Sequence, residues 1–271
     1  MSKLDRYLRT DIMPTFICPG CTHGTAWQSL IRAIDDLGLN QNKTAMVCAI
    51  GCAGKLPTYM DFPSLRTPHG RALSYATGLK MSRPELNVIV FMGDGDATAI
   101  GGNHLVHAAR RNINLTAIIA NNQIYGMTGG QYAPTTQKGD KASTAPFGMV
   151  EPDVNIEELV IGAGASFFGR GDAYYVKELP DLFSKAIDHK GFSVVEVLTT
   201  CPTQYGRRNN YNDAAELLKT LKEITISKKQ AENLPPEDQK NKVPRGVLYK
   251  EDRPEFIDEY DRITNFKEGD K

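Results

Sequence analysis

The sequence predicts an α/β protein with a doubly wound, mainly parallel sheet. Apolar runs of strand length, at residues 44–50, 87–92, 115–120, 165–169 and 193–198, alternate with segments whose apolar residues recur at helical spacing. This alternation is typical of βαβ units, in which a helix connects two parallel strands. With 271 residues, 41% of them hydrophobic, the chain can bury one sizeable core. We therefore expect a single sheet domain over residues 1–206. A charged C-terminal region over 207–271 should follow, with one amphipathic helix over about 214–232 and an extended arm.

The most informative unit covers residues 87–122. A strand ends at Gly93-Asp94-Gly95, a helix follows over 102–111, and a second strand runs into Asn121 and Asn122. Open α/β sheets bind ligands at the carboxyl ends of their strands. Asp94 and Asn122 offer oxygens suited to Mg²⁺, which keeps further positions for phosphate oxygens, and the two glycines allow close backbone approach. An Asp-Gly pair alone predicts only a turn, but with the asparagines at the next strand end it indicates a metal and diphosphate site.

The five cysteines indicate metal or redox chemistry, since nothing in the chain predicts secretion and a disulfide framework. Cys18 and Cys21 have CxxC spacing, which is compatible with zinc, an iron–sulfur cluster or a redox dithiol. Cys52 and Cys201 each follow a strand, and Cys52 is expected in a glycine-flanked loop. Cys48 lies inside a strand and is expected in the core. Without Cys48, four thiols remain, the number that a [4Fe–4S] cluster needs.

Two further segments carry candidate residues. Residues 51–55 faintly suggest a Walker A loop, but the required GxxxxGK[ST] spacing is missing, so we reject a nucleotide triphosphate site. Lys55 could pair with a substrate carboxylate. His69 precedes the helix expected over 72–81, where a histidine could cap the helix, pack, or contact an anion. The stretch 132–152 shows no apolar period, and so long a loop is usually functional, covering a ligand or contacting a partner.

Taken together, these motifs resemble the β subunit of the 2-oxoacid:ferredoxin oxidoreductases. The GDG and NN pair resembles the thiamine diphosphate motif of transketolase-like enzymes, and its extension NQIYGMTGGQ at 122–131 narrows the match. The HGRA motif at 69–72, CPGC at 18–21, IGC at 50–52 and CPT at 201–203 also resemble motifs of the family. The match runs from about residue 18 to 206, and the charged tail is less diagnostic.

The resemblance implies a site for thiamine diphosphate and Mg²⁺ beside a [4Fe–4S] cluster. It assigns Mg²⁺ to Asp94, the Asn122 side chain and the Ile124 carbonyl. It assigns the cluster to Cys18, Cys21, Cys52 and Cys201. His69 and Lys55 are the catalytic candidates. The residues expected to contact the cofactor are Ile50, Gly51, Cys52, Ala53, His69, Gly93, Gly95, Asp96, Gly126 and Met127.

The activity implied is oxidative decarboxylation of a 2-oxoacid with coenzyme A to acyl-CoA and CO2, with electrons passing through the cluster to ferredoxin. The substrate expected is 2-oxoglutarate, with pyruvate and branched-chain acids as alternatives. In thiamine enzymes, the carboxylate that activates the aminopyrimidine ring lies on another domain. We therefore expect an α subunit to complete the site in a dimer of heterodimers, contacting loop 132–152 and arm 207–271. Whether further small subunits join is left open by the sequence.

Two alternatives explain less of the chain. A non-redox thiamine diphosphate carboligase or decarboxylase leaves Cys18, Cys21 and Cys201 unexplained. A structural zinc- or cluster-binding subunit leaves the GDG and NN unit unexplained. Zero formal net charge and the absence of a long basic block argue against nucleic acid binding. The apolar runs are too short for a membrane span and the N-terminus lacks a signal-peptide core, so we expect a cytoplasmic protein.

Overall fold

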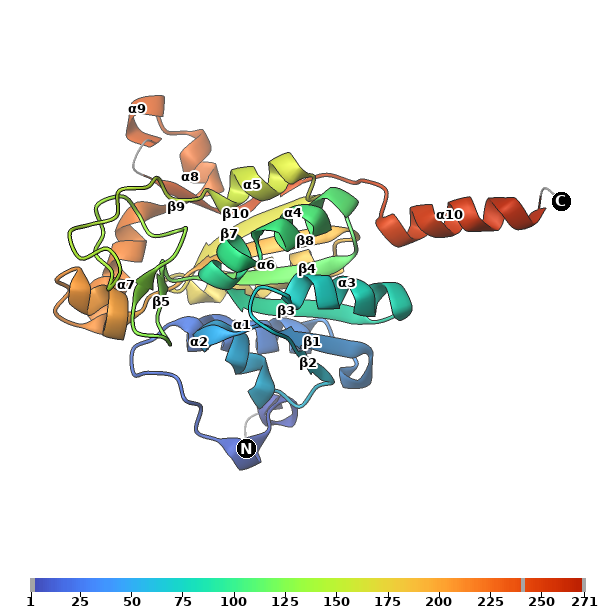
Figure 1. The fold of residues 1–271 in the computed structure, drawn as a ribbon, viewed down its shortest axis with the longest axis horizontal. Helices are drawn as coiled ribbons and strands as arrows, with labels where there is room; N and C mark the ends of the chain where they lie inside the picture. The colour runs from blue at the N-terminus through green and yellow to red at the C-terminus, as the bar shows by residue number, and fades with distance from the viewer. Residues whose placement is uncertain (1–2, 240–241, 270–271) are drawn as a thin grey trace.

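The computed structural model describes residues 3–239 and 242–269. Its centre is an eight-stranded sheet in the order β2-β1-β3-β4-β8-β7-β10-β9 (Figure 1). Neighbouring strands are parallel except β10, which is antiparallel to β7. The strands of this sheet are β1 (Thr44–Cys48), β2 (Ser64–Arg66), β3 (Asn87–Gly93), β4 (Leu115–Asn121), β7 (Phe167–Asp172), β8 (Phe192–Leu198), β9 (Thr225–Ser227) and β10 (Val243–Lys250). The mainly parallel α/β sheet is thus confirmed.

Helices surround the sheet, and a small hairpin, β5 (Ile124–Tyr125) with β6 (Gln131–Tyr132), extends from the end of β4. A π-helix, Asp96–Ile100, follows β3, and a second, Pro202–Gly206, follows β8. The α-helices are α1 (His23–Asp36), α2 (Gly51–Lys55), α3 (Ala72–Ser82), α4 (Gly102–Arg111), α5 (Ile156–Ala163), α6 (Leu179–Asp188), α7 (Ala214–Ile224), α8 (Lys228–Glu232), α9 (Pro236–Gln239) and α10 (Phe256–Gly269). Over residues 3–239 and 242–269, no helix has both the length and the apolar composition needed to cross a bilayer.

Two apolar clusters fill opposite faces of the sheet. Along β3, Ile89 and Phe91 belong to one cluster and Val88, Val90 and Met92 to the other, because successive strand residues point to opposite faces. Helices α1 and α6 cover the first face, and α3, α4 and α5 cover the second. Strands buried on both faces are nearly continuous apolar runs in the sequence.

The carboxyl ends of β3, β4 and β8 lie side by side. Gly93 at the end of β3 is aligned with Ala120 of β4, and Asn121 of β4 is aligned with Leu198 of β8. The segments that follow these strands are therefore brought to one edge of the sheet. This register is what allows residues far apart in the chain to form one site.

Some local elements differ from those expected. The segment after β1 forms the short helix α2 instead of an open loop. The single helix expected over about 214–232 is divided into α7, β9 and α8. The β-branched Thr225 and Ile226 interrupt the helix because they pair with β10. Ser227 then starts α8 with a capping box.

The sheet continues past residue 206, where the sequence predicted a separate arm. Strand β10 adds to the edge of β7, with Gly246 aligned to Arg170, and β9 then pairs with β10. Beyond β10, helix α10 projects away from the body (Figure 1). The expected contact of this region with a partner stays a prediction.

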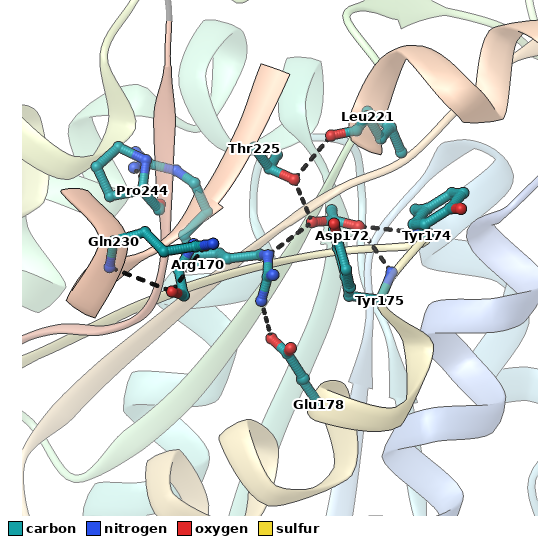
Figure 2. A network of polar contacts seen from close by, with 11 residues as sticks. Arg170, Asp172, Tyr174, Tyr175, Glu178, Leu221, Thr225, Gln230 and Pro244 are labelled. Atoms are coloured by element: carbon teal, nitrogen blue, oxygen red, sulfur yellow. Dashed lines mark hydrogen bonds and ion pairs between the residues drawn. The ribbon is translucent and has the colours of Figure 1, made fainter. Parts of the chain in front are cut away.

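A buried polar network holds β10 to the body (Figure 2). Asp172 accepts hydrogen bonds from the Thr225 hydroxyl and the Tyr175 amide, each at 2.9 Å. Arg245 of β10 lies with Nε 3.8 Å from Asp172 Oδ2 and also pairs with Glu178. Its guanidinium carbon is 3.6 Å from the centre of the Tyr175 ring. The buried charges of this network are thus paired within the chain.

Candidate functional site

A cavity of about 110 Å³ opens at the carboxyl edge of the sheet. It is bordered by the ends of β1 and β3, the β4–β5 connection and the first turn of α1. Every residue expected to contact the cofactor, and every expected Mg²⁺ ligand, lines it, although their roles stay predictions. The lining residues are His23, Ile50, Gly51, Cys52, Ala53, His69, Gly93, Asp94, Gly95, Asp96, Asn122, Ile124, Tyr125, Gly126, Met127 and Thr128.

The end of the Asn122 amide meets two oxygens at the cavity, the Ile124 carbonyl and an Asp94 carboxylate oxygen. With its oxygen turned inward, the Asn122 amide places Oδ1 2.8 Å from the Ile124 carbonyl oxygen and 3.3 Å from Asp94 Oδ1. An ionised carboxylate, a carbonyl and an amide oxygen have no proton to share. The group is therefore satisfied either by turning the amide so that its NH2 donates to both, or by a cation among the oxygens. A hard cation such as Mg²⁺ suits this set of ligands.

Asp94 is 3% exposed, and its carboxylate accepts a hydrogen bond from the long loop after β6. The Thr135 hydroxyl donates to Asp94 Oδ2 at 2.5 Å, so this loop does reach the site. Burial raises the pKa of Asp94 to about 6, while the bonds from Thr135 and from nearby backbone amides oppose the shift. A cation beside the carboxylate would favour its ionised form.

His69 is oriented by a chain of contacts around the turn after β3. Its Nδ1 pairs with Asp96 Oδ1, which also accepts from the Gly70 amide at 2.8 Å. The His69 ring meets Tyr125 edge-on, with 6.0 Å between centroids, and the Tyr125 hydroxyl donates to the Gly95 carbonyl at 3.0 Å. A Cβ on Gly95 would lie 2.4 Å from the Tyr125 ring, so this close approach requires glycine.

Four thiols gather on the other side of the cavity. The Sγ atoms of Cys201 and Cys52 lie 3.2 and 3.8 Å from the point where Gly126 would carry a Cβ. Burial raises the pKa of Cys21 to about 12 and that of Cys52 to about 11, and the thiols of Cys201 and Cys18 add to both shifts. Such thiols are protonated at neutral pH, and metal binding would displace their protons.

The four thiols do not converge on one point. Among the described residues, no three His, Cys, Asp or Glu side chains meet around one metal-ion position. A [4Fe–4S] cluster has a thiolate on each iron, so it needs thiols that are close without converging on one point. Cys48 lies apart in β1, fully buried, with its Sγ 3.9 Å from the Met46 carbonyl oxygen.

Lys55 does not border the cavity. It ends α2, and its Nζ lies 4.6 Å from the centre of the Phe16 ring. The expected pairing with a substrate carboxylate stays a prediction, and it requires the side chain to leave Phe16.

His23, Tyr125 and Thr128 line the cavity but were not among the residues expected there. His23 is 2% exposed, and burial lowers its pKa to about 4. Burial also raises the pKa of Tyr125 to about 12. His23 lies two residues after the CxxC motif, at the start of α1, and this position alone does not indicate that its ring is enclosed.

The chain is similar in sequence to proteins of a known family. Residues 43–197 match the family model described as thiamine pyrophosphate enzyme, C-terminal TPP binding domain. The chain is 47% identical to the 2-oxoglutarate synthase subunit KorB of Archaeoglobus fulgidus, over 96% of this chain and 94% of that protein. It is 42% identical to the subunit of the same name from Methanothermobacter marburgensis, over 97% and 93% of the two chains.

A relative that matches over a smaller part of its length and a solved structure belong to the same family of enzymes. The 2-oxoacid:ferredoxin oxidoreductase subunit beta of Saccharolobus solfataricus is 43% identical over 72% of this chain and 63% of its own. A solved 2-oxoglutarate:ferredoxin oxidoreductase from Magnetococcus marinus superposes with a TM-score of 0.87 at 31% identity, covering 98% of this chain and 91% of that one. The chain therefore belongs to the β-subunit family of the 2-oxoacid:ferredoxin oxidoreductases and carries a thiamine diphosphate-binding domain.

Proposed function

We propose that the chain is the thiamine diphosphate-binding subunit of a 2-oxoglutarate:ferredoxin oxidoreductase. The complex would convert the 2-oxoacid and coenzyme A to acyl-CoA and CO2, with electrons passing through a [4Fe–4S] cluster to ferredoxin. One observation carries the proposal: a single cavity has the oxygens of Asp94, Asn122 and Ile124 on one side and Cys52, with the other three thiols, on the other. A non-redox carboligase or decarboxylase has no use for the thiol side.

On the oxygen side, Asp94, the Asn122 amide and the Ile124 carbonyl would hold Mg²⁺. The backbone at Gly93 and Gly95 would then approach the diphosphate. When bound, thiamine diphosphate supplies the electron sink for decarboxylation. His69, held by Asp96 and Tyr125, presents its ring at the cavity wall, where it can keep a proton or a hydrogen bond directed at a bound molecule.

On the thiol side, Cys18, Cys21, Cys52 and Cys201 would bind the cluster. Cys52 also borders the cofactor cavity, whereas Cys18 is exposed at the surface. Electrons would therefore enter from the cavity and leave toward ferredoxin near Cys18. A glycine at position 126 fits a cluster at this place, because a side chain there would intrude on the thiols of Cys52 and Cys201.

The site would be completed by an α subunit. The cavity of about 110 Å³ is smaller than the roughly 300–1,000 Å³ of typical ligand sites, so this chain supplies only part of the walls. The loop that carries Thr135 also bears Phe147, 99% exposed, and Val150, 80% exposed. Apolar side chains so exposed are typical of partner contacts. We expect a dimer of αβ heterodimers.

The relatives support 2-oxoglutarate as substrate. Two that match almost end to end are called 2-oxoglutarate synthase subunits, and the solved structure was determined with 2-oxoglutarate, coenzyme A and succinyl-CoA bound. Lys55 could pair with a carboxylate of this diacid. Pyruvate and branched-chain acids remain the alternatives to test.

The decisive assay measures reduction of ferredoxin or a viologen by the purified complex with coenzyme A and each of several 2-oxoacids in turn. We expect the highest kcat/KM with 2-oxoglutarate, and a preference for pyruvate would overturn this substrate assignment. The chain alone should be inactive with every acid and gain activity on titration with α subunit, saturating at one partner per chain. Ferredoxin reduction by the chain alone would disprove the shared site. A colourless, iron-free complex that still decarboxylates would favour the non-redox alternative.

A further inference from the structure

One polar side chain of the cavity, that of His23, has no hydrogen-bond partner within the part of the chain that the structure describes. His23 opens α1 and is 2% exposed, and its Nδ1 is sealed from solvent without a hydrogen-bond partner among the described residues. Since His23 lines the cavity and Nε2 is not sealed, Nε2 is the ring nitrogen that a bound molecule can reach.

A buried ring without partners is unfavourable for the fold. An unpaired polar group destabilises a protein interior, whereas an apolar side chain of similar size would not. His189 shows the usual structural solution in the same chain: it is also buried, and its Nε2 lies 2.7 Å from the Ser166 hydroxyl. His23 therefore occupies a position whose chemistry the folded chain does not itself require.

The backbone that carries His23 is firmly placed. The Thr22 hydroxyl accepts from the Thr200 amide at 2.7 Å and lies 3.2 Å from the Thr200 hydroxyl, which fixes the start of α1 to the end of β8. The His23 backbone amide also interacts with the Cys21 thiol. The ring is thus held at the cavity wall before any ligand arrives, as a binding group should be.

We infer that His23 binds a ligand in the cavity through an Nε2–H hydrogen bond to an anionic oxygen. The inference rests on the proposed function, which supplies two such anions: the cofactor diphosphate and the carboxylate of the 2-oxoacid. A histidine ring always carries at least one N–H, and its hydrogen bond to an anion is stronger than one to a neutral acceptor.

The test compares His23→Leu with His23→Gln in the complex with the α subunit. Leucine removes the donor, whereas glutamine keeps an amide N–H near the position of Nε2. Calorimetry gives the Kd of thiamine diphosphate with Mg²⁺, and steady-state kinetics at saturating cofactor give the KM for the substrate 2-oxoglutarate. Iron content and the Tm without ligand are recorded for each protein. His107→Leu, an exposed change on α4 away from the cavity, is the matched control.

We expect His23→Leu to keep its iron and to keep or raise its ligand-free Tm, while one ligand binds about 10- to 100-fold more weakly. His23→Gln should recover most of that loss, and His107→Leu should change nothing. A weaker Kd for thiamine diphosphate assigns the bond to the diphosphate. An unchanged Kd with a raised KM assigns it to the 2-oxoacid carboxylate.

Other results overturn the inference in distinguishable ways. Wild-type affinity of His23→Leu for both ligands would overturn it while leaving the proposed function intact. A lower ligand-free Tm together with lost iron would show a structural role instead. A wild-type complex that binds no thiamine diphosphate would overturn the proposed function and this inference with it.

Discussion

Two buried polar clusters on the same sheet differ in how their groups are matched. Around Asp172, unlike groups face one another: its carboxylate meets the Thr225 hydroxyl and the Tyr175 amide (Figure 2). The Arg245 guanidinium also lies beside it. Around the cavity, thiols lie near thiols, and the Asn122 amide lies against two oxygens, the Ile124 carbonyl and Asp94 Oδ1. In the first cluster the charged groups are paired within the chain. We propose that ions of opposite character complete the second cluster, a cation among the oxygens and iron among the thiols.

The same contrast separates two adjacent residues of one motif. The Asn121 amide donates to Glu196 at 2.8 Å, and Glu196 also accepts from Arg170 at 2.7 Å. Asn121 is thus matched inside the chain and supports the strand end, whereas the next residue, Asn122, turns toward the cavity. An Asn-Asn pair that looks uniform in sequence therefore divides into a structural residue and a candidate metal ligand.

The largest effect is expected from substitutions of the four cysteines beside the cavity. Alanine at Cys18, Cys21, Cys52 or Cys201 should remove the iron and abolish electron transfer, because a cluster that loses one of four thiolates is poorly held. Cys48→Ala, the matched control, should keep both, since Cys48 lies apart in β1. Iron content and visible absorption of the purified complex measure this. Full iron content in the Cys201 variant would rule out the four-ligand assignment.

On the oxygen side, Asp94→Ala should abolish Mg²⁺-dependent binding of thiamine diphosphate while the iron is largely kept. Removing one of the few protein ligands leaves the diphosphate charge poorly neutralised, a loss on the order of several kcal/mol. Calorimetric titration of the complex gives the affinity, with the exposed Asp153→Ala as control. Unchanged affinity in the Asp94 variant would refute the metal assignment.

Breaking the cluster around Asp172 should instead lower the free energy of unfolding. Arg245→Met leaves Asp172 buried without its cation, and removing one partner of a buried ion pair costs about 3–5 kcal/mol of unfolding free energy. Denaturant unfolding measures the loss, and thiamine diphosphate affinity of the folded complex should stay unchanged. The exposed Arg262→Met, which also breaks an ion pair, should have no measurable effect. Equal stability of the two variants would show that the cluster around Asp172 does not stabilise the fold.

The sequence predicted the centre of the fold because its signals there are local. Strands buried on both faces are apolar throughout, and the residues that follow parallel strands must meet at one edge. Asp94, Asn122 and Cys201 could therefore be brought together without any knowledge of the register. Their spacing also separated them from Cys48, whose position inside a strand predicts burial.

Features that depend on distant partners could not be predicted in the same way. Strand β10 contains Pro244 and lies in a charged region, and it becomes a strand because it pairs with β7 and is held by Asp172. His23 was missed because only the packing of α1 against the end of β8 shows that its ring is enclosed without a partner. Neither fact is visible in the neighbouring residues of the chain.

The smallest effect is expected at a matched group far from the cavity, His189, whose Nε2 lies 2.7 Å from the Ser166 hydroxyl. Burial lowers the pKa of His189, and Lys250 lowers it further while Asp252 opposes the shift. The folded chain therefore binds fewer protons at His189 than the unfolded chain. The stability that comes from keeping His189 neutral is present above the unfolded pKa of about 6.5 and is lost as the pH falls below it. His189→Gln keeps a donor to Ser166 but cannot be protonated in this range. Between pH 7.5 and pH 5.5, on the order of two pH units across that pKa, the unfolding free energy of the wild-type chain should fall more than that of the variant. All other titrating groups are shared, so equal falls in the two proteins would show that His189 contributes nothing to the pH dependence.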